Sequence, residues 1–416
     1  MESFNYIAGT LHCENTDIKA IIEKVGSPLY LYSKSSFEAH YNRLDNVLSK
    51  EKIRHLIAYA VKANSNLSII NIFAKLGAGA DVVSGGEIYK ALAGGIKPSK
   101  MVYAGVGKTA EEIKYALKSG IGQFNIESQS ELKKINNIAA SQGMTASIAI
   151  RVNPNVDPKT HPYISTGMKK YKFGIPLEQA FELYKDAESM KGIRIKGIHC
   201  HIGSQLTDLS VFNDAAKIIV EFLKKLKLSG IMLETIDIGG GIGIKYLNDE
   251  VINLDSYAEI AKRIVSVYPE ALLICEPGRF MVGEGGALVT KILYIKDNGE
   301  KLFYIVDAAM TDLIRPTLYH AEHKIIPVTL KNGSGKVTVD VVGPVCESGD
   351  FLAKNISIDR MAEGNLIAVM SAGAYGFSMS SHYNARPNIA EVLVDKDQFS
   401  VIRRPETYKD LIKAEV

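Results

Sequence analysis

The chain has 416 residues, of which 46% are hydrophobic and 23% charged. This is an ordinary composition for a globular protein, and the length suits one large domain plus a smaller one. The 49 basic and 46 acidic residues give a formal net charge of +3, so neither nucleic acid nor an acidic membrane is expected as the main partner.

The N-terminal segment gives no sign of export or membrane insertion. It lacks a basic region followed by an apolar one, and no stretch approaches the roughly 20 apolar residues that span a bilayer. The four cysteines are far apart and form no Cys-x-x-Cys pair: Cys13, Cys200, Cys275 and Cys346. Neither a disulfide framework nor a structural zinc site is expected, and the predicted compartment is the cytoplasm.

From about residue 55 to residue 279, short apolar runs alternate with amphipathic segments. Most of the runs are rich in Val, Ile or aromatic residues and end in polar or glycine residues, as buried parallel strands do. In chain order they are 55–64, 80–84, 101–105, 121–128, 147–154, 195–204, 233–241 and 272–279. The helix-like segments are 67–76, 87–93, 110–119, 131–142, 177–190, 211–228 and 256–267. This alternation predicts an α/β fold, a (β/α)8 barrel of the TIM type, with a doubly wound open sheet as the alternative.

After Arg279 the pattern becomes β-rich. Strand-like segments are 288–296, 301–306, 324–330, 336–342 and 390–394. Asn298-Gly299 and Asn332-Gly333 are dipeptides typical of hairpins. We therefore expect a second, C-terminal β-rich domain, a barrel or sandwich, and the strand-like segment Pro28–Tyr32 is expected to pack with it. The predicted domains are 31–279 for the barrel and 1–30 with 280–416 for the β-rich domain.

Polar residues interrupt the apolar runs at their C-terminal ends, the face on which active sites of (β/α)8 barrels assemble. They are Lys62, Asp81, Ser84, Arg151, His199, His201, Ser204, Gly239, Gly240, Gly241, Glu276 and Arg279. Lys62 ends an apolar run, where an unpaired charge would be costly. It is either a lysine that reaches solvent at the strand tip or one that forms a Schiff base.

The glycine run Gly239–Gly241 would let backbone N–H groups approach a phosphate. It lacks the GxGxxG spacing of a dinucleotide site, and a purely structural turn is the alternative. Glu276 and Arg279 end the last strand and could form a surface ion pair. A carboxylate there could instead keep a pyridine nitrogen protonated, which makes the ring the electron sink that loss of CO2 from an amino acid requires.

His199 and His201 are two residues apart, so on a strand they share a face. Two ligands without a third nearby make a poor metal site. We therefore expect no metal, and a histidine stacked on an aromatic cofactor ring instead.

Together these residues resemble diaminopimelate decarboxylases, which belong to the fold-type III pyridoxal-phosphate family with ornithine decarboxylase and alanine racemase. The resemblance runs from about Pro28 to Arg404. The motifs that carry it are 59–64 (YAVKAN), 79–87 (GADVVSGGE), 197–205 (GIHCHIGSQ), 237–241 (DIGGG), 276–279 (EPGR), 343–350 (GPVCESGD) and 372–376 (AGAYG). Seven motifs in family order are far more specific than any one alone. The segment 161–174 also matches a family segment that borders the active site.

The resemblance implies a pyridoxal 5′-phosphate cofactor carried on Lys62 as a Schiff base, with His201 stacked on its ring and Glu276 at its nitrogen. The implied cofactor-binding residues are Lys62, Asp81, His201, Ser204, Gly240, Gly241, Glu276, Gly278, Arg279 and Tyr375. Cys346 would protonate the carbon that loses CO2. In this family that cysteine comes from the other subunit, so a homodimer with shared active sites is implied, completed by the β-rich domain.

The distal end of the substrate decides which amino acid is used. Ornithine and lysine end in a bare amine, whereas diaminopimelate ends in a second amino-acid centre and needs a cation and an acid together. The segment Thr311–Tyr319 matches the diaminopimelate pattern, and Arg315 with Arg279 would bind the distal carboxylate. The implied substrate-binding residues are Arg279, Arg315, Tyr319, Glu347 and Tyr375.

We therefore predict conversion of meso-2,6-diaminopimelate to L-lysine and CO2, the last step of lysine biosynthesis. The alternatives are a decarboxylase of ornithine, lysine, arginine or carboxynorspermidine, a racemase, or a non-enzymatic cofactor carrier. Glu276 disfavours a racemase, because alanine racemase has an arginine at the ring nitrogen. The β-rich domain, Cys346 and Glu347 disfavour a carrier.

Overall fold

The computed structural model describes residues 3–157, 172–247, 249–330, 333 and 335–416. It forms two compact units: a barrel unit of residues 40–244 and 250–280, and a β-rich unit of residues 1–39, 245–249 and 281–416. Most of the predicted site-bordering segment 161–174, and Asn332 of the second predicted hairpin dipeptide, lie outside the described residues.

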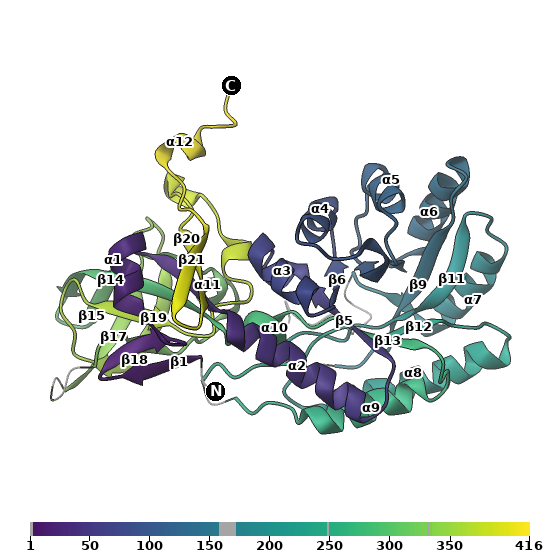
Figure 1. Cartoon of the computed structure of the whole chain (residues 1–416), viewed down its shortest axis with the longest axis horizontal. Helices are drawn as coiled ribbons and strands as arrows, with labels where there is room; N and C mark the ends of the chain where they lie inside the picture. The colour runs from purple at the N-terminus through teal and green to yellow at the C-terminus, as the bar shows by residue number, and fades with distance from the viewer. Residues whose placement is uncertain (1–2, 158–171, 248, 331–332, 334) are drawn as a thin grey trace. The chain divides into compact units, whose positions relative to one another are not determined.

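Eight parallel strands form a closed barrel in the first unit (Figure 1). They are β5 (His55–Ala60), β6 (Gly79–Val82), β7 (Met101–Tyr103), β8 (Gln123–Ile126), β9 (Ala146–Asn153), β11 (Ile193–His199), β12 (Thr235–Asp237) and β13 (Leu272–Cys275). Each pairs with the next, and β13 pairs with β5 to close the ring. The predicted (β/α)8 barrel is confirmed, and the open sheet is wrong because the first and last strands are hydrogen-bonded. A two-residue strand, β10 (Ile175–Pro176), adds to β9.

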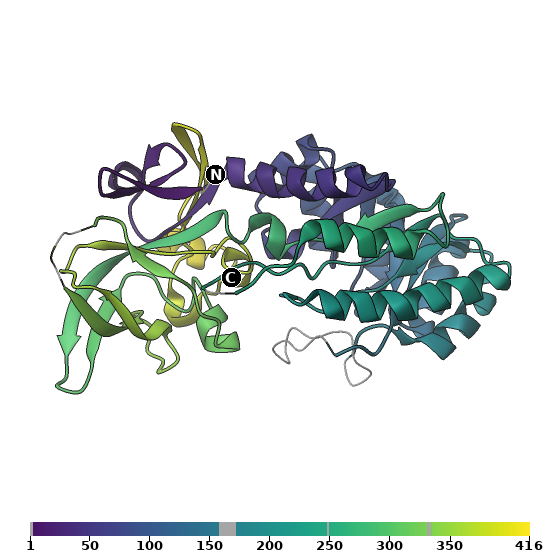
Figure 2. The same ribbon diagram turned by 90° about the horizontal axis from the view of Figure 1, so that it is seen from below.

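The seven predicted helices of this region are all present, with ends within a few residues of the expected ones. They are α3 (Leu67–Lys75), α4 (Gly85–Ala93), α5 (Ala110–Ser119), α6 (Gln129–Ser141), α7 (Leu177–Glu188), α8 (Leu209–Leu228) and α9 (Leu254–Val265). Figure 1 shows them outside the barrel strands, and α8 and α9 run side by side in Figure 2. The short helices are η1 (Val61–Ala63), η2 (Pro98–Lys100) and α10 (Arg279–Val282).

A long helix, α2 (Lys34–Lys50), was not predicted. Its signal was present, because Phe37, Tyr41, Leu44 and Leu48 recur at helical spacing and all four are buried. Another helix near the N-terminus, α1 (Ile18–Val25), was also missed.

The second unit is built on an antiparallel-rich sheet in the order β18-β17-β15-β14-β4-β20-β21, with β16 and β19 attached through β14. Its strands are β4 (Leu29–Ser33), β14 (Gly286–Asp297), β15 (Leu302–Val306), β16 (Ile325–Pro327), β17 (Lys336–Val342), β18 (Phe351–Asp359), β19 (Leu366–Val369), β20 (Ala390–Asp395) and β21 (Gln398–Arg403). Strand β4 pairs with β14 and β20, so the predicted N-terminal strand does join this sheet. Strands β18, β19 and β21 were not predicted.

The remaining elements of this unit are small. A three-stranded sheet comprises β1 (Phe4–Ile7), β2 (Thr10–Cys13) and β3 (Thr16–Asp17). The short helices are α11 (Arg315–Tyr319), η4 (Phe377–Met379), η5 (Tyr383–Ala385) and α12 (Tyr408–Leu411). Within the described residues, no helix has both the length and the apolar character needed to cross a membrane. All four cysteines are free thiols, and Cys346 is the exposed one.

One close approach inside the barrel positions the site. A Cβ atom on Gly197 of β11 would lie 1.9 Å from Oγ1 of Thr235 on the neighbouring strand β12. No residue other than glycine fits there without moving that strand. Gly197 therefore leaves room for the Thr235 hydroxyl, which is the outer end of a hydrogen-bond chain that leads into the site.

Candidate active site

Lys62 lies in the 3-10 turn η1 directly after β5, two residues beyond the last residue of the strand rather than on it. Its Nζ atom donates a hydrogen bond to Oδ2 of Asp81 at the end of β6. Asp81 is fully buried, and its Oδ1 atom has no hydrogen-bond partner among the described residues. Burial and the nearby Glu276 raise the pKa of Asp81, and Lys62 acts in the opposite direction. The lysine is thus held over a buried carboxyl group at the active-site end of the barrel.

Glu276 follows β13 and is 5% exposed. Its Oε2 atom lies 3.1 Å from Nε2 of His199, and its Oε1 atom accepts a hydrogen bond from Nδ2 of Asn125 at 3.3 Å. Burial alone would raise the pKa of Glu276, but His199 and the more distant Lys62 hold it well below the usual range. Glu276 is therefore a buried carboxylate that keeps its negative charge.

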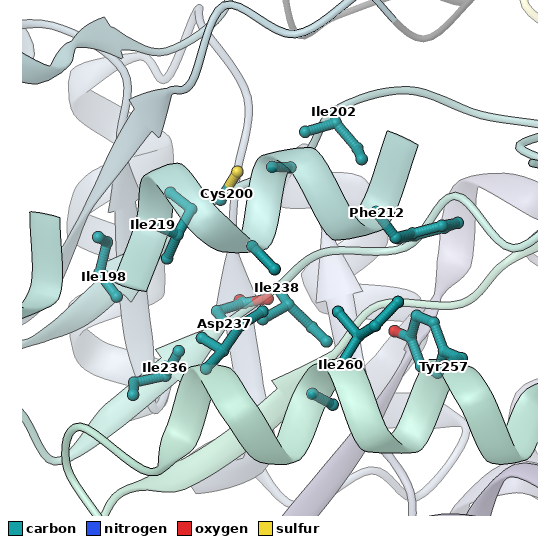
Figure 3. Close-up of a pocket in the computed structure, with 14 residues that line it drawn as sticks. Ile198, Cys200, Ile202, Phe212, Ile219, Ile236, Asp237, Ile238, Tyr257 and Ile260 are labelled. Atoms are coloured by element: carbon teal, nitrogen blue, oxygen red, sulfur yellow. The ribbon is translucent and has the colours of Figure 1, made fainter. Parts of the chain in front are cut away.

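Asp237, at the end of β12, is a second buried carboxyl group beside Glu276. Its Oδ1 atom accepts a hydrogen bond from the N–H of Gly239, and its Oδ2 atom accepts one from Nδ2 of Asn125 at 3.4 Å. It also borders an apolar cavity of about 30 Å³, to which β11, β12, α8, α9 and the loops after both strands contribute apolar side chains (Figure 3). Burial and the charge of Glu276 raise the pKa of Asp237 well above its usual value. Two carboxyl groups this close do not both ionise, and Glu276 carries the charge.

His199, Asp237 and Glu276 each offer one ligand atom, and these atoms lie within 4.8 Å of one another. The sequence analysis paired His199 with His201, whereas the structure groups His199 with Asp237 and Glu276. The protonated Asp237 is a poor metal ligand, however, and Glu276 already accepts hydrogen bonds on both oxygens. The arrangement suits a hydrogen-bonded carboxylate better than a metal centre.

A chain of side-chain hydrogen bonds fixes the Asn125 amide. Oγ1 of Thr235 donates to Oε1 of Gln123 at 2.6 Å, and Nε2 of Gln123 donates to Oδ1 of Asn125 at 2.8 Å. Because the amide oxygen of Asn125 is used in this way, its NH2 group faces Glu276 and Asp237. The three side chains are buried and lie across the inside of the barrel.

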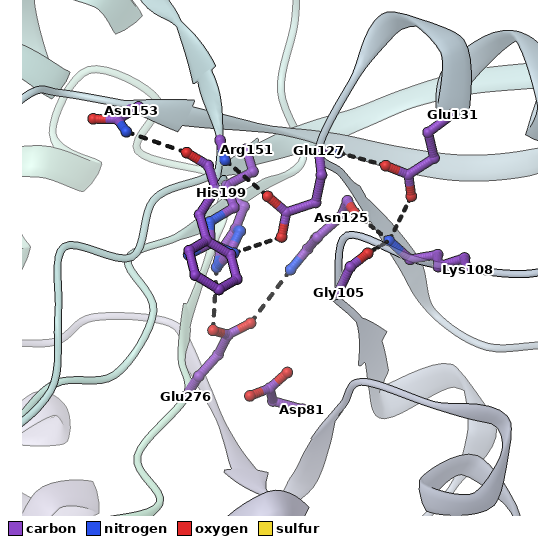
Figure 4. A network of polar contacts seen from close by, with 12 residues as sticks. Asp81, Gly105, Lys108, Asn125, Glu127, Glu131, Arg151, Asn153, His199 and Glu276 are labelled. Carbon is purple, nitrogen blue, oxygen red and sulfur yellow. Dashed lines mark hydrogen bonds and ion pairs between the residues drawn. The ribbon is translucent and has the colours of Figure 1, made fainter. Parts of the chain in front are cut away.

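Two buried ion pairs lie in the polar network around Asn125 (Figure 4). Lys108 pairs with Glu131 and also donates to the carbonyl oxygen of Asn125 at 2.8 Å. Arg151 pairs with Glu127, the residue two positions after Asn125. Asn125, Glu127 and Lys108 were not predicted as part of the site. A signal for Asn125 and Glu127 was visible, because they alternate with Gln123 along one predicted strand and so share a face.

The glycine loop after β12 passes very close to neighbouring backbone. A Cβ atom on Gly240 would lie 2.2 Å from the carbonyl oxygen of Glu276, and Gly239 and Gly241 have φ values of +68° and +109°. These positions require glycine for space or for conformation. The N–H of Gly240 donates to Nδ1 of His201 at 3.1 Å. Burial and nearby cations hold the pKa of His201 well below its usual value, so its imidazole is neutral and can stack on an aromatic ring.

Ser204 and Arg279 lie together in the same region, with NH2 of Arg279 3.2 Å from Oγ of Ser204. Gly278 packs against Ala60 and Ala63 on either side of Lys62, since a Cβ atom on it would lie 3.0 Å from both methyl groups. Ser84, noted at a strand end, instead caps helix α4 by accepting a hydrogen bond from the N–H of Glu87. The remaining barrel residues predicted from sequence thus surround the end of the barrel at which Lys62 lies.

Five predicted residues lie in the β-rich unit: Arg315, Tyr319, Cys346, Glu347 and Tyr375. Arg315 begins helix α11 and is 5% exposed, and its NH1 atom contacts His323. The loop that contains Cys346 is ordered by polar contacts, since the N–H of Cys346 donates to Oδ1 of Asn384 at 2.8 Å. The N–H of Gly349 donates to Oε1 of Glu347 at 3.2 Å. His323 was not predicted.

Comparison with known proteins identifies the class. Residues 34–283 match the family of the pyridoxal-dependent decarboxylase, pyridoxal binding domain. The chain is 46% identical to the diaminopimelate decarboxylase of Aquifex aeolicus over 98% of this chain and 96% of that one. It superposes on two solved diaminopimelate decarboxylases in complex with L-lysine. That of Helicobacter pylori has a TM-score of 0.91, 43% identity and coverage of 96% and 99% of the two chains. That of M. jannaschii has a TM-score of 0.94, 38% identity and coverage of 100% and 98%.

The chain therefore belongs to the pyridoxal-dependent decarboxylases, and its cofactor is pyridoxal 5′-phosphate. Within that class, its family is that of the diaminopimelate decarboxylases.

The barrel residues fit this cofactor. A glycine loop with no room for side chains, next to Ser204 and Arg279, suits a phosphate group. Lys62 has the primary amine that a Schiff base with the cofactor requires, and the buried anion of Glu276 suits a protonated ring nitrogen.

The position of Asn125 predicts that its loss affects both stability and catalysis. In Asn125→Leu, Glu276 and Asp237 each lose a buried donor, which costs about 1–3 kcal/mol in the free energy of unfolding. We also expect kcat to fall, because Glu276 is no longer held on its Oε1 side. Thermal unfolding and decarboxylation kinetics would measure the two effects. The control is Asn137→Leu on the exposed face of α6, and an Asn125→Leu protein as stable and active as this control would contradict the assignment.

Proposed function

We propose that the protein decarboxylates meso-2,6-diaminopimelate to L-lysine and CO2, the last step of lysine biosynthesis. Relatives named diaminopimelate decarboxylase align with this chain over nearly their full length. Two solved structures of such enzymes hold L-lysine, the expected product. The buried Glu276 carboxylate is the observation on which the proposed chemistry rests. A carboxylate beside the cofactor nitrogen would keep that nitrogen protonated, and the protonated ring would withdraw electrons from the bound amino acid.

The bound cofactor supplies an electron sink into which the electron pair of the breaking Cα–CO2 bond can move. The barrel residues prepare that chemistry. Lys62 carries the cofactor covalently, and Asp81 holds the lysine amine in place. The charge of Glu276 would keep a proton on the ring nitrogen, and the neutral imidazole of His201 would stack on the ring. Ser204, Gly240, Gly241, Gly278 and Arg279 hold the phosphate, with Tyr375 from the β-rich unit.

The distal half of the substrate needs both signs of charge. In our proposal Arg315, Arg279 and Tyr319 bind its carboxylate, and Glu347 pairs with its amine. Burial of Arg315 supports this role, since a charge-assisted hydrogen bond gains strength away from water. A substrate that ends in a bare amine would leave the arginines without an anion, which disfavours ornithine and lysine as substrates.

Cys346 completes the reaction in this proposal by giving a proton to the carbon that has lost CO2. We propose that it acts in the active site of a second subunit, so that the enzyme is a homodimer with shared sites. The exposure of Cys346 and the ordered loop around it support this role. Four free thiols also favour a reducing compartment, and we propose the cytoplasm.

Replacing Arg315 tests the substrate assignment. With pyridoxal 5′-phosphate present, the wild-type protein is expected to form lysine from meso-diaminopimelate and no amine from ornithine. Arg315→Ala should lose transition-state binding of about 2–5 kcal/mol, seen as a large fall in kcat/KM for diaminopimelate. A fully active variant would show that the distal pocket is elsewhere. A wild-type protein that forms no lysine would overturn the proposed function itself.

Mixing two inactive variants tests the shared site. Lys62→Ala and Cys346→Ala should each be nearly inactive alone. If subunits exchange, half of the dimers are mixed and each has one intact site, so the mixture should recover about a quarter of wild-type activity. The same mixture without recovery, although native mass spectrometry shows mixed dimers, would place Cys346 in the site of its own subunit.

A further inference from the structure

Arg315 contacts the buried side chain of His323, and the hydrogen bonds of this histidine determine its protonation state. NH1 of Arg315 lies 2.7 Å from Nε2 of His323, which is 4% exposed. A guanidinium only donates hydrogen bonds, so Nε2 accepts. On the other side of the ring, Nδ1 lies 2.8 Å from the carbonyl oxygen of Met370, which only accepts, so Nδ1 carries the proton. Both contacts together require a neutral imidazole protonated at Nδ1.

The backbone fixes where this ring lies. His323 stands two residues before β16, which pairs with β19, and Met370 directly follows β19. The N–H of Met370 donates to the carbonyl oxygen of Lys324 at 2.8 Å. His323 and Met370, whose carbonyl oxygen accepts the hydrogen bond from Nδ1, therefore lie at the same end of one strand pair. The pairing of β16 with β19 thus sets the position of Nε2.

Tyr246 fixes the plane of the guanidinium. Cζ of Arg315 lies 4.6 Å from the centre of the Tyr246 ring, and that ring meets His323 edge-on, with centroids 5.1 Å apart and planes at 79°. Stacking on an aromatic face sets the plane of a guanidinium but leaves it able to turn within that plane. The hydrogen bond to His323 removes that remaining freedom.

We propose that His323 is a positioning residue for substrate specificity, which holds Arg315 in the orientation that binds the distal carboxylate. This rests on the proposed function, in which Arg315 binds that group. A carboxylate in place of His323 would also orient the guanidinium, but it would compete with the substrate for the positive charge. A neutral imidazole accepts the hydrogen bond and leaves the charge in place. Preference for a substrate with a second carboxylate thus depends on a side chain that does not touch the substrate.

Two replacements separate the contacts of His323. Asn keeps a donor for the Met370 carbonyl but removes the acceptor for Arg315, whereas Gln restores an acceptor near the position of Nε2. His323→Asn should raise KM for diaminopimelate on the order of tenfold with little change in kcat, and His323→Gln should recover most of this. The inhibition constant for L-lysine, which retains the distal amino-acid centre, should rise in parallel. The matched control is His320→Asn, on the exposed end of α11, where φ of 51° suits asparagine.

A double-mutant cycle gives the decisive result. If His323 acts through Arg315, His323→Asn should have no further effect on KM in an Arg315→Ala protein. Additive effects, or a fall in kcat without a change in KM, would overturn this role while the wild-type activity leaves the proposed function standing. A wild-type protein that forms no lysine from diaminopimelate would instead overturn the proposed function.

NMR of the wild-type protein labelled with 15N-histidine tests the proposal even if the His323→Asn variant does not fold. Using His323→Gln for assignment, the spectrum should show a neutral ring protonated at Nδ1. A ring protonated at Nε2, or at both nitrogens, would contradict the proposal.

Discussion

The site depends on one constraint, namely that a negative charge is kept inside a closed barrel. Glu276 is nearly buried, and a carboxylate in such a place normally takes up a proton. His199 and Asn125 each supply a hydrogen bond to one of its oxygens, and the neighbouring Asp237 takes the proton in its place. This division between two adjacent carboxyl groups leaves a buried anion, which in our proposal is the partner of the cofactor nitrogen.

The packing of the barrel makes this division stable. Gly197 is small enough for the Thr235 hydroxyl to lie against it, and Thr235 orients Gln123, which in turn orients Asn125. A polar chain of this kind stabilises a buried charge only when each member has its partner. In the β-rich unit a buried positive charge is held in a similar way. The neutral imidazole of His323 orients the Arg315 guanidinium without cancelling its charge.

Much of this could be predicted from the sequence because strands in a parallel barrel have a strong local signature. All eight apolar runs are strands, and the polar residues at their ends do gather at one end of the barrel. The missed strands β18 and β21 have many exposed or half-buried residues, so their apolar runs are short and less distinct. Strand β19 was missed although its four residues are apolar and mostly buried. Helix α2 was missed although its apolar spacing is clear. The sequence pattern places Asn125 on one face of a strand with Gln123, but it does not show what Asn125 or His323 does, because their roles come from hydrogen bonds to residues distant in the chain.

Replacing Glu276 by glutamine tests the central claim most directly, because glutamine has the shape of glutamate without its charge. The account predicts that Glu276→Gln still binds pyridoxal 5′-phosphate through Lys62, seen as the near-visible absorbance of the bound cofactor. Its kcat for diaminopimelate should nevertheless fall on the order of 100-fold, the usual scale for losing a group that controls a proton. A glutamine variant that keeps wild-type kcat would contradict the account, because the buried charge would then have no part in the reaction.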